Sequence, residues 1–138
     1  MPAHSTTIVP RFGELDPYNH VNHAAYVAYF EAARCVALDE IEMSLADLSE
    51  RGLQIVVTHL DVKFREPATA RDILTVETQI VELKRVSSTW RQRIIRESDG
   101  KDLVEAELTL GVCDMSGKPT RPPADLNVTL SRLTENDE

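Results

Sequence analysis

Residues 11–34 read RFGELDPYNHVNHAAYVAYFEAAR, and this stretch decides the fold. A loop rich in Gly, Asp, Pro and Asn over residues 13–22 leads into a run that carries almost no charge. The apolar and small residues of that run fall on nearly every side of a helix. This pattern predicts a long helix over residues 23–40, buried in the middle of the fold. Asn22, a favoured N-cap residue, stands directly before it.

The segments on either side of this helix carry strand and helix signals of their own. Residues 5–12 predict a short strand, and Pro10 favours an edge position or a bulge within it. A second, short helix is expected to start at Ser44, because Asp47 three residues later completes a pair similar to a capping box. Gly52 is a favourable residue to end that helix.

Beyond residue 52 the hydrophobic period changes from that of a helix to that of a strand. Four antiparallel strands are expected, over residues 58–64, 73–83, 86–97 and 103–114. The last segment, residues 125–134, is expected to be a frayed helix or coil. The order of elements predicts one antiparallel sheet wrapped around one central helix. Its edges would invite pairing with a second copy, so a homodimer is expected.

Length and composition fit one globular domain. The chain has 138 residues, of which 42% are hydrophobic and 28% charged. A net charge of −8 argues against nonspecific nucleic-acid binding, which needs a basic face. Cys35 and Cys113, with no signal peptide, predict a reduced cytoplasmic setting. No apolar run is long enough to span a bilayer, so no membrane insertion is expected.

The loop before the long helix carries the chemistry. Asp16 can serve as a general base or as a nucleophile, but an Asp before Pro is also a common turn former, and both interpretations stay open. The first turn of a helix has free N–H groups and a positive dipole end. Such groups can hold a carbonyl oxygen that becomes an oxyanion. The loop and the helix together therefore predict an acyl-transfer site.

Two histidines stand close to this carboxylate. His20 and His23 are three residues apart, and an imidazole there could bond a substrate carbonyl or orient a carboxylate. For His20, a ring satisfied by loop backbone is an equal alternative. The only other histidines are His4 and His59, which are too few further ligands for a metal, so no metal is expected.

The quoted stretch resembles the signature of the hotdog-fold acyl thioesterases of the 4-hydroxybenzoyl-CoA thioesterase type. HAAYVAYFEAAR is similar to the Tol-Pal-associated acyl-CoA thioesterase branch, and LDPYNHVN to the acyl-ACP thioesterases of plants and bacteria. The resemblance implies an α+β hotdog fold, an antiparallel sheet wrapped around a long central helix. It also implies one hotdog thioesterase-like domain over residues 1–138.

The resemblance implies roles for single residues. Asp16 falls on the catalytic carboxylate, and His23 on the position at the helix start whose backbone N–H polarises the thioester carbonyl. His20 falls on the catalytic histidine of the acyl-ACP branch. Two positions depart from the family. Tyr18 stands where the acyl-ACP branch has Asn, and Asn19 stands where the 4-hydroxybenzoyl branch has Gly.

The substrate is expected to enter a pocket between two subunits of a homodimer or homotetramer. Contacts to it are expected from Tyr18, Asn19, Asn22, Tyr26, His59 and Arg85. Arg85 is the preferred choice for the phosphates of CoA among six basic residues: Lys63, Arg65, Lys84, Arg85, Arg91 and Arg93. No cofactor is expected.

The expected activity is hydrolysis of an acyl-CoA. The alternatives are an acyl-ACP thioesterase, a hydratase or dehydratase on the same fold, and a noncatalytic acyl-binding module. Glu31 is a rival catalytic carboxylate, since other hotdog thioesterases use one on the central helix. Its spacing to Arg34 predicts instead a structural ion pair.

Overall fold

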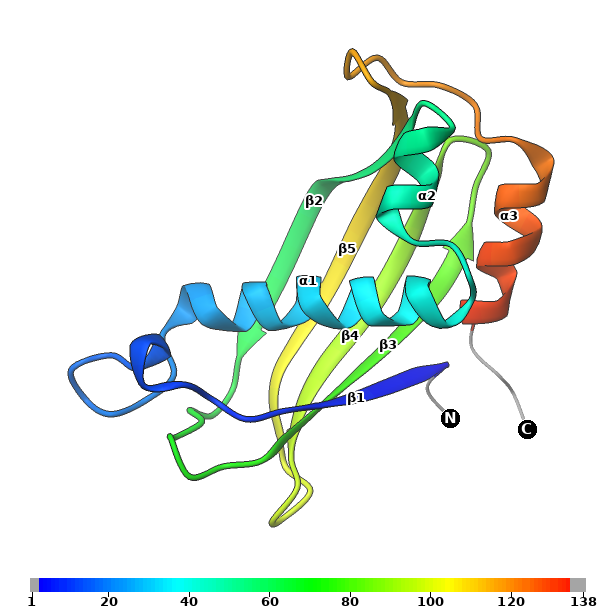
Figure 1. Cartoon of the computed structure of the whole chain (residues 1–138). Coiled ribbons are helices and arrows are strands. Elements are labelled where there is room, and N and C mark those ends of the chain that lie inside the picture. The colour runs from blue at the N-terminus through cyan, green and yellow to red at the C-terminus, as the bar shows by residue number, and fades with distance from the viewer. Residues whose placement is uncertain (1–2, 135–138) are drawn as a thin grey trace.

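The computed structural model describes residues 3–134 and shows a five-stranded antiparallel sheet crossed on one face by a long helix (Figure 1). The strands are β1 (His4–Ile8), β2 (Leu53–Phe64), β3 (Leu74–Leu83), β4 (Ser87–Arg96) and β5 (Asp102–Asp114). The helices are α1 (His23–Glu40), α2 (Leu45–Glu50) and α3 (Ala124–Leu130), with short 3-10 turns at Phe12–Glu14 and Ser131–Leu133. The expected domain, residues 1–138, extends past the described residues at both ends.

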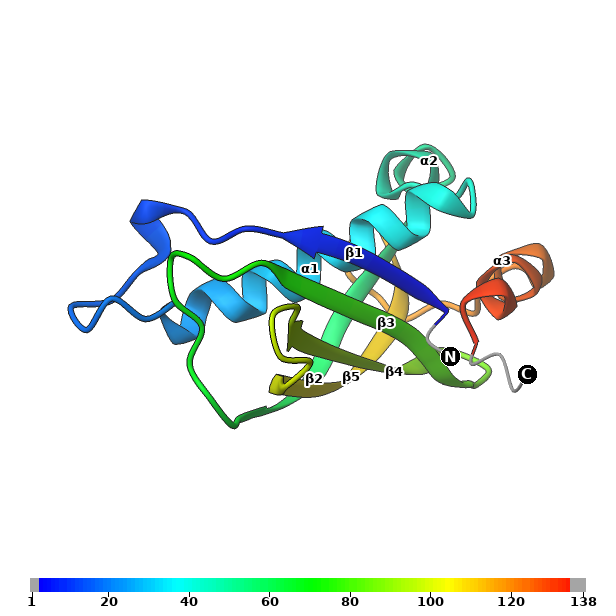
Figure 2. The ribbon, with the colours of Figure 1, turned by 90° about the horizontal axis from the view of Figure 1, so that it is seen from below.

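The sheet has the order β1-β3-β4-β5-β2, and its twist is evident from below (Figure 2). One face of the three inner strands is closed by apolar side chains, as the alternation predicts. On β3 and β5 these are Leu74, Val76, Ile80, Val104, Ala106, Leu108, Leu110 and Val112, all buried. The predicted strands are confirmed, and β2 is longer than expected because it already begins at Leu53.

The first strand is shorter than the predicted range 5–12. It ends at Ile8, and the chain then passes through Pro10 into the 3-10 turn Phe12–Glu14. Proline has no N–H to donate to a ladder, so pairing with β3 stops before it. β1 is an edge strand, which agrees with the edge signal from Pro10.

The long helix has the predicted bounds, and the predicted cap is confirmed. The Ala25 amide donates to Asn22 Oδ1 at 2.9 Å. The expectation that α1 is buried on most faces is wrong for the single chain. One face packs on the sheet, while Ala24, Ala28 and Ala32 on the opposite side are exposed, and Val27 and Val36 on its two flanks are 37% and 38% exposed. The apolar residues of that outward face are therefore uncovered in one copy of the chain.

The short elements follow the sequence closely. Ser44 and Asp47 form a capping box at the start of α2, and Gly52 follows its end with a φ of +75°. The last segment is an ordered helix and 3-10 turn rather than coil. Its buried residues Leu126, Leu130 and Leu133 fix it to the core.

Candidate active site

Asp16 is both a turn former and a carboxylate with a free oxygen. Its Oδ1 accepts hydrogen bonds from the backbone amides of Tyr18 at 2.8 Å and His20 at 3.0 Å. Its own amide donates to the His20 carbonyl at 2.7 Å, and Asn19 takes the left-handed φ of +63° that the turn requires. Within residues 3–134 the other oxygen, Oδ2, has no hydrogen bond. The turn thus fixes the carboxylate and leaves one oxygen for chemistry.

The start of α1 offers unpaired donors beside this turn. Helices leave their first amides without internal partners. Asn22 occupies the Ala25 amide, but the amides of His23 and Ala24 have no acceptor among the described residues. These amides lie at the N-terminal end of the helix, which is the positive end of its dipole. A negative charge that develops there is stabilised.

The loop is held to the body of the molecule on both of its arms. Leu15 and Val21 form an isolated β-bridge, and the Val21 amide donates to the Ala68 carbonyl at 2.8 Å. The Ala68 amide in turn donates to the Tyr26 hydroxyl at 2.9 Å. Asn22 Nδ2 donates to the Glu14 carbonyl at 2.9 Å. The carboxylate and the helix amides are therefore held in one rigid unit.

The structure brings His20 and His23 to this unit. His20 is half-buried and its backbone forms a bridge with Thr69. The ring of His23 is exposed and meets the edge of Phe64, with ring centroids 4.6 Å apart. Neither imidazole has a hydrogen bond within residues 3–134, so each has polar atoms available to a substrate.

Two of the predicted contact residues, His59 and Arg85, lie away from the unit in the same chain. His59 is exposed on β2, five residues before Phe64, which is about 16 Å along an extended strand. Arg85 lies in the β3–β4 connection and precedes Val86, whose carbonyl accepts from the Val112 amide near the end of β5. The loop that carries Asp16, residues 13–22 (the Asp16 loop), instead contacts the β2–β3 connection. That connection bonds the Leu103 carbonyl, at the other end of β5.

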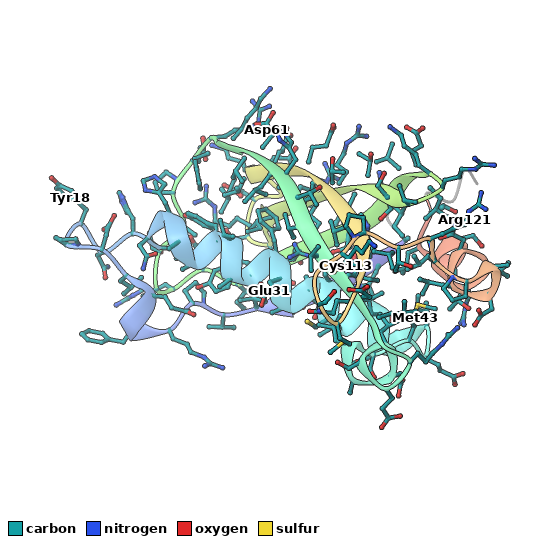
Figure 3. The ribbon with its side chains drawn as sticks, turned by 90° about the horizontal axis from the view of Figure 1, so that it is seen from above. Tyr18, Glu31, Met43, Asp61, Cys113 and Arg121 are labelled. Atoms are coloured by element: carbon teal, nitrogen blue, oxygen red, sulfur yellow. The ribbon has the colours of Figure 1, made fainter. Side chains whose placement is uncertain are left out.

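The remaining predicted contact residues divide by burial. Tyr18 is 80% exposed at the tip of the loop and points away from the molecule (Figure 3). Asn19 beside it is also exposed. Tyr26 is buried and its hydroxyl is already engaged, and Asn22 uses both ends of its side chain within the fold. Tyr26 and Asn22 therefore support the site from within.

The predicted ion pair between Glu31 and Arg34 is wrong. Glu31 is exposed on α1 (Figure 3), and no cation lies within 4 Å of it in the described part of the chain. Arg34 turns inward, and its Nη1 donates to Gln92 Oε1 at 2.9 Å. Gln92 Nε2 donates to the Phe30 carbonyl and to Thr78 Oγ1. Burial lowers the pKa of the Arg34 guanidinium.

This buried polar network was not foreseen from the sequence. A signal for it existed, because Gln92 stands between Trp90 and Ile94 on the inward face of β4. A polar residue at an inward position needs a buried partner. Tyr29, which donates to Glu14 Oε1 at 2.7 Å, was also missed.

The outer face of the sheet is charged and internally paired. A hollow of about 410 Å³ lies there, lined by β2–β5. In register across four strands, Glu77, Arg93, Glu105 and Lys63 alternate in sign. Arg65, Arg91 and Arg93 form ion pairs with carboxylates of this face. Of the six basic candidates, only Lys63, Lys84 and Arg85 have no ion pair within residues 3–134.

In contrast to the charged outer face, the surface beside α1 is apolar and exposed to solvent. The inward side of β2 presents Val57, Leu60 and Phe64, which are 43%, 37% and 45% exposed. The uncovered face of α1 adds Val27. Phe64 touches His23 and Tyr26, so this surface begins at the Asp16 loop.

Two further features bear on ligands. Over residues 3–134 there is no group of three or more His, Cys, Asp and Glu side chains placed to hold a metal ion. None of the helices in that range combines the length and apolar character needed to cross a membrane.

Comparisons with known proteins identify relatives of this chain in sequence and in fold. Residues 10–130 match the family model described as the thioesterase-like superfamily. The chain is 31% identical over 110 residues to the long-chain acyl-CoA thioesterase FadM of Escherichia coli, covering 80% of this chain and 83% of that protein. It is 31% identical over 124 residues to the acyl-CoA thioesterase YbgC of Haemophilus influenzae, covering 88% and 90%. The solved structure of a probable thioesterase from Bartonella henselae superimposes with a TM-score of 0.82 at 27% identity, covering 87% and 98%.

Proposed function

Since the chain belongs to the thioesterase-like superfamily, we propose that it is an acyl-CoA thioesterase that hydrolyses its substrate to a free acid and CoA. One observation carries the proposal. Two backbone amides fix the Asp16 carboxylate through Oδ1, while within residues 3–134 its Oδ2 and the amides of His23 and Ala24, at the start of the next helix, have no hydrogen-bond partner. Relatives named acyl-CoA thioesterases support the substrate class.

The two groups divide the reaction between them. The thioester oxygen accepts hydrogen bonds from the His23 and Ala24 amides, which stabilise the oxyanion as it forms. Acting as a general base, Asp16 Oδ2 takes a proton from the water that attacks the carbonyl carbon. The carbon–sulfur bond then breaks, and the CoA thiolate takes up that proton. Acting instead as a nucleophile, Asp16 would displace the CoA thiolate from the carbonyl carbon to form a mixed anhydride, and water would then cleave the anhydride to the free acid and the Asp16 carboxylate.

We propose that the acyl chain lies on the exposed apolar surface of Val27, Val57, Leu60 and Phe64. This surface adjoins the Asp16 loop, whereas the hollow on the outer face is lined mainly by charged and polar side chains and is unsuited to a hydrocarbon. Tyr18 and Asn19, exposed at the loop tip, would meet the substrate at its entry. We propose that His20, half-buried with no hydrogen bond to its ring within residues 3–134, orients the thioester or the water.

A second copy of the chain would cover the same surface. β2 is an edge strand, and its exposed apolar side chains continue onto the uncovered face of α1. Exposed apolar patches and unpaired edges mark association sites. We therefore propose a homodimer, with the acyl chain between the subunits and Arg85 and His59 reaching a site only from the partner subunit. The free cysteines Cys35 and Cys113 support a cytoplasmic setting.

Thiol release from a panel of acyl-CoAs, aliphatic and aromatic, tests the activity. Turnover of at least one member is expected, and the preferred member gives the acyl class. The same acyl groups on a carrier protein form the second arm, and turnover there alone would assign an acyl-ACP thioesterase. Hydration of an enoyl-CoA without thiol release would assign the hydratase alternative. Binding without either reaction would leave an acyl-binding module and contradict the proposal.

A further inference from the structure

Glu14 is the point at which the Asp16 loop is tied to the long helix. Its Oε1 accepts two hydrogen bonds, from the Arg11 amide and from the Tyr29 hydroxyl, both at 2.7 Å. Its backbone carbonyl accepts two more, from the amide and the side chain of Asn22 at 2.8 and 2.9 Å. Glu14 therefore joins the entry of the loop, the end of the loop and α1.

Tyr29 is built to hold this carboxylate. It lies in the second turn of α1, is 4% exposed, and packs edge-on against Tyr26 with ring centroids 6.3 Å apart. Burial and the Glu14 carboxylate hold its pKa well above the ordinary tyrosine value, so the hydroxyl keeps its proton and donates throughout the neutral range. A hydrogen bond to a charged acceptor is stronger than one between neutral groups.

The two tyrosines anchor opposite ends of the Asp16 loop. Tyr26 anchors its C-terminal end through Ala68 and Val21, and Tyr29 anchors its N-terminal end through Glu14. Asp16 lies between the two anchored ends. Both anchors come from the first two turns of α1, the same rigid segment that carries the His23 and Ala24 amides. Catalysis depends steeply on the relative placement of such groups.

We propose that Tyr29 and Glu14 form a positioning pair that sets Asp16 against the first-turn amides of α1. The proposal rests on the proposed thioesterase function for its catalytic consequence. Its structural consequence, a fixed loop, is independent of that function. The pair touches no reacting atom, so it acts on the rate through Asp16 and leaves the apolar acyl surface unchanged.

Tyr29→Phe tests the pair because it removes only the hydroxyl. We expect kcat to fall about tenfold with KM within twofold, since the loop shifts while the acyl surface stays. Glu14→Gln keeps an acceptor oxygen and should retain most of kcat, whereas Glu14→Ala should match Tyr29→Phe. The double variant Tyr29→Phe/Glu14→Ala should be no slower than either single one, because both remove the same bond.

A matched control removes a hydroxyl–carboxylate bond elsewhere. Thr75 Oγ1 donates to Glu97 Oε1 at 3.0 Å in a pair outside the site, and Thr75→Val should leave kcat unchanged. Additive losses in the double variant, or wild-type kcat in a folded Tyr29→Phe, would overturn the positioning role.

Amide hydrogen exchange provides a readout that does not depend on activity. In Tyr29→Phe the Asp16, His20 and Asn22 amides should exchange about tenfold faster, while the second half of α1 keeps its protection. Unchanged exchange over residues 14–22 would overturn the proposal even if no acyl-CoA is turned over. Absence of turnover by the wild type, together with faster exchange in the variant, would instead refute the proposed function and leave the pair in place.

Discussion

The Asp16 loop and the outer face of the sheet are both rich in charge, but they use it differently. On the outer face, Glu77, Arg93 and Glu105 oppose one another in register, and each arginine there has a carboxylate partner. In the loop, Asp16 keeps one oxygen without a hydrogen bond within residues 3–134, and the helix that follows the loop begins with amides that have no acceptor in that range. The two regions differ in whether their polar groups are paired within the fold, and the proposed function assigns the chemistry to the unpaired groups of the loop.

The largest expected effect on kcat comes from removing the backbone N–H of His23. Proline is tolerated at the first position of a helix, and Asn22 already has the extended conformation required before a proline, with φ −72° and ψ 156°. His23→Pro should therefore fold normally and lower kcat by about 10²–10³, the usual cost of one oxyanion donor. His23→Ala keeps the amide and should lose far less. Equal losses in both variants would assign the role to the imidazole.

Charge placed on the open apolar surface should separate the subunits. Leu60→Asp leaves the single chain folded, because Leu60 is already 37% exposed, but it opposes burial against a second copy. We expect a monomer in analytical ultracentrifugation, with activity falling as the dimer is lost. Val128→Asp, on the far helix α3 at a site 70% exposed, is the matched control and should stay dimeric. A Leu60→Asp dimer would show that association uses another face.

A smaller effect is expected at the rival carboxylate. Glu31 has no ion pair within residues 3–134 and no fixed donor, so it lacks the orientation that two amides give Asp16. Glu31→Gln should change kcat by less than about threefold. A loss of two decades in steady-state kcat would make Glu31 the catalytic carboxylate.

The smallest effect is expected on the outer face. Arg91 and Glu107 are 3.7 Å apart and their side chains are 53% and 58% exposed, so Glu107→Gln should cost at most about 1 kcal/mol of unfolding free energy. Denaturant unfolding measures that cost, and kcat should be unchanged. A decrease in kcat would connect the charged face to the reaction.

Local patterns predicted most of the fold. The bounds of α1 and its Asn22 cap follow from the apolar run and the residue before it, and the inward residues of β3 and β5 follow from strict alternation. β1 ends at Ile8, before the predicted end at residue 12, because Pro10 has no N–H to donate to the ladder.

Features that depend on distant residues could not be predicted in this way. Arg34 prefers Gln92 to Glu31 because the sheet presents a buried acceptor 58 residues away in sequence. The bond from Tyr29 to Glu14 and the distance of Arg85 from the loop likewise follow from tertiary packing. The exposed face of α1 reflects a surface that one chain does not cover.

The central claim is that Asp16 Oδ2 acts as the general base or the nucleophile in thioester hydrolysis. Asp16→Asn tests it most directly, because the amide oxygen can still accept from Tyr18 and His20 while the basic and nucleophilic oxygen is lost. The measurement is kcat for thiol release from the preferred acyl-CoA, with the fold of the variant checked by circular dichroism and thermal unfolding. We predict a loss of at least about 10² in a normally folded variant. Wild-type kcat in that variant would contradict the assignment of Asp16.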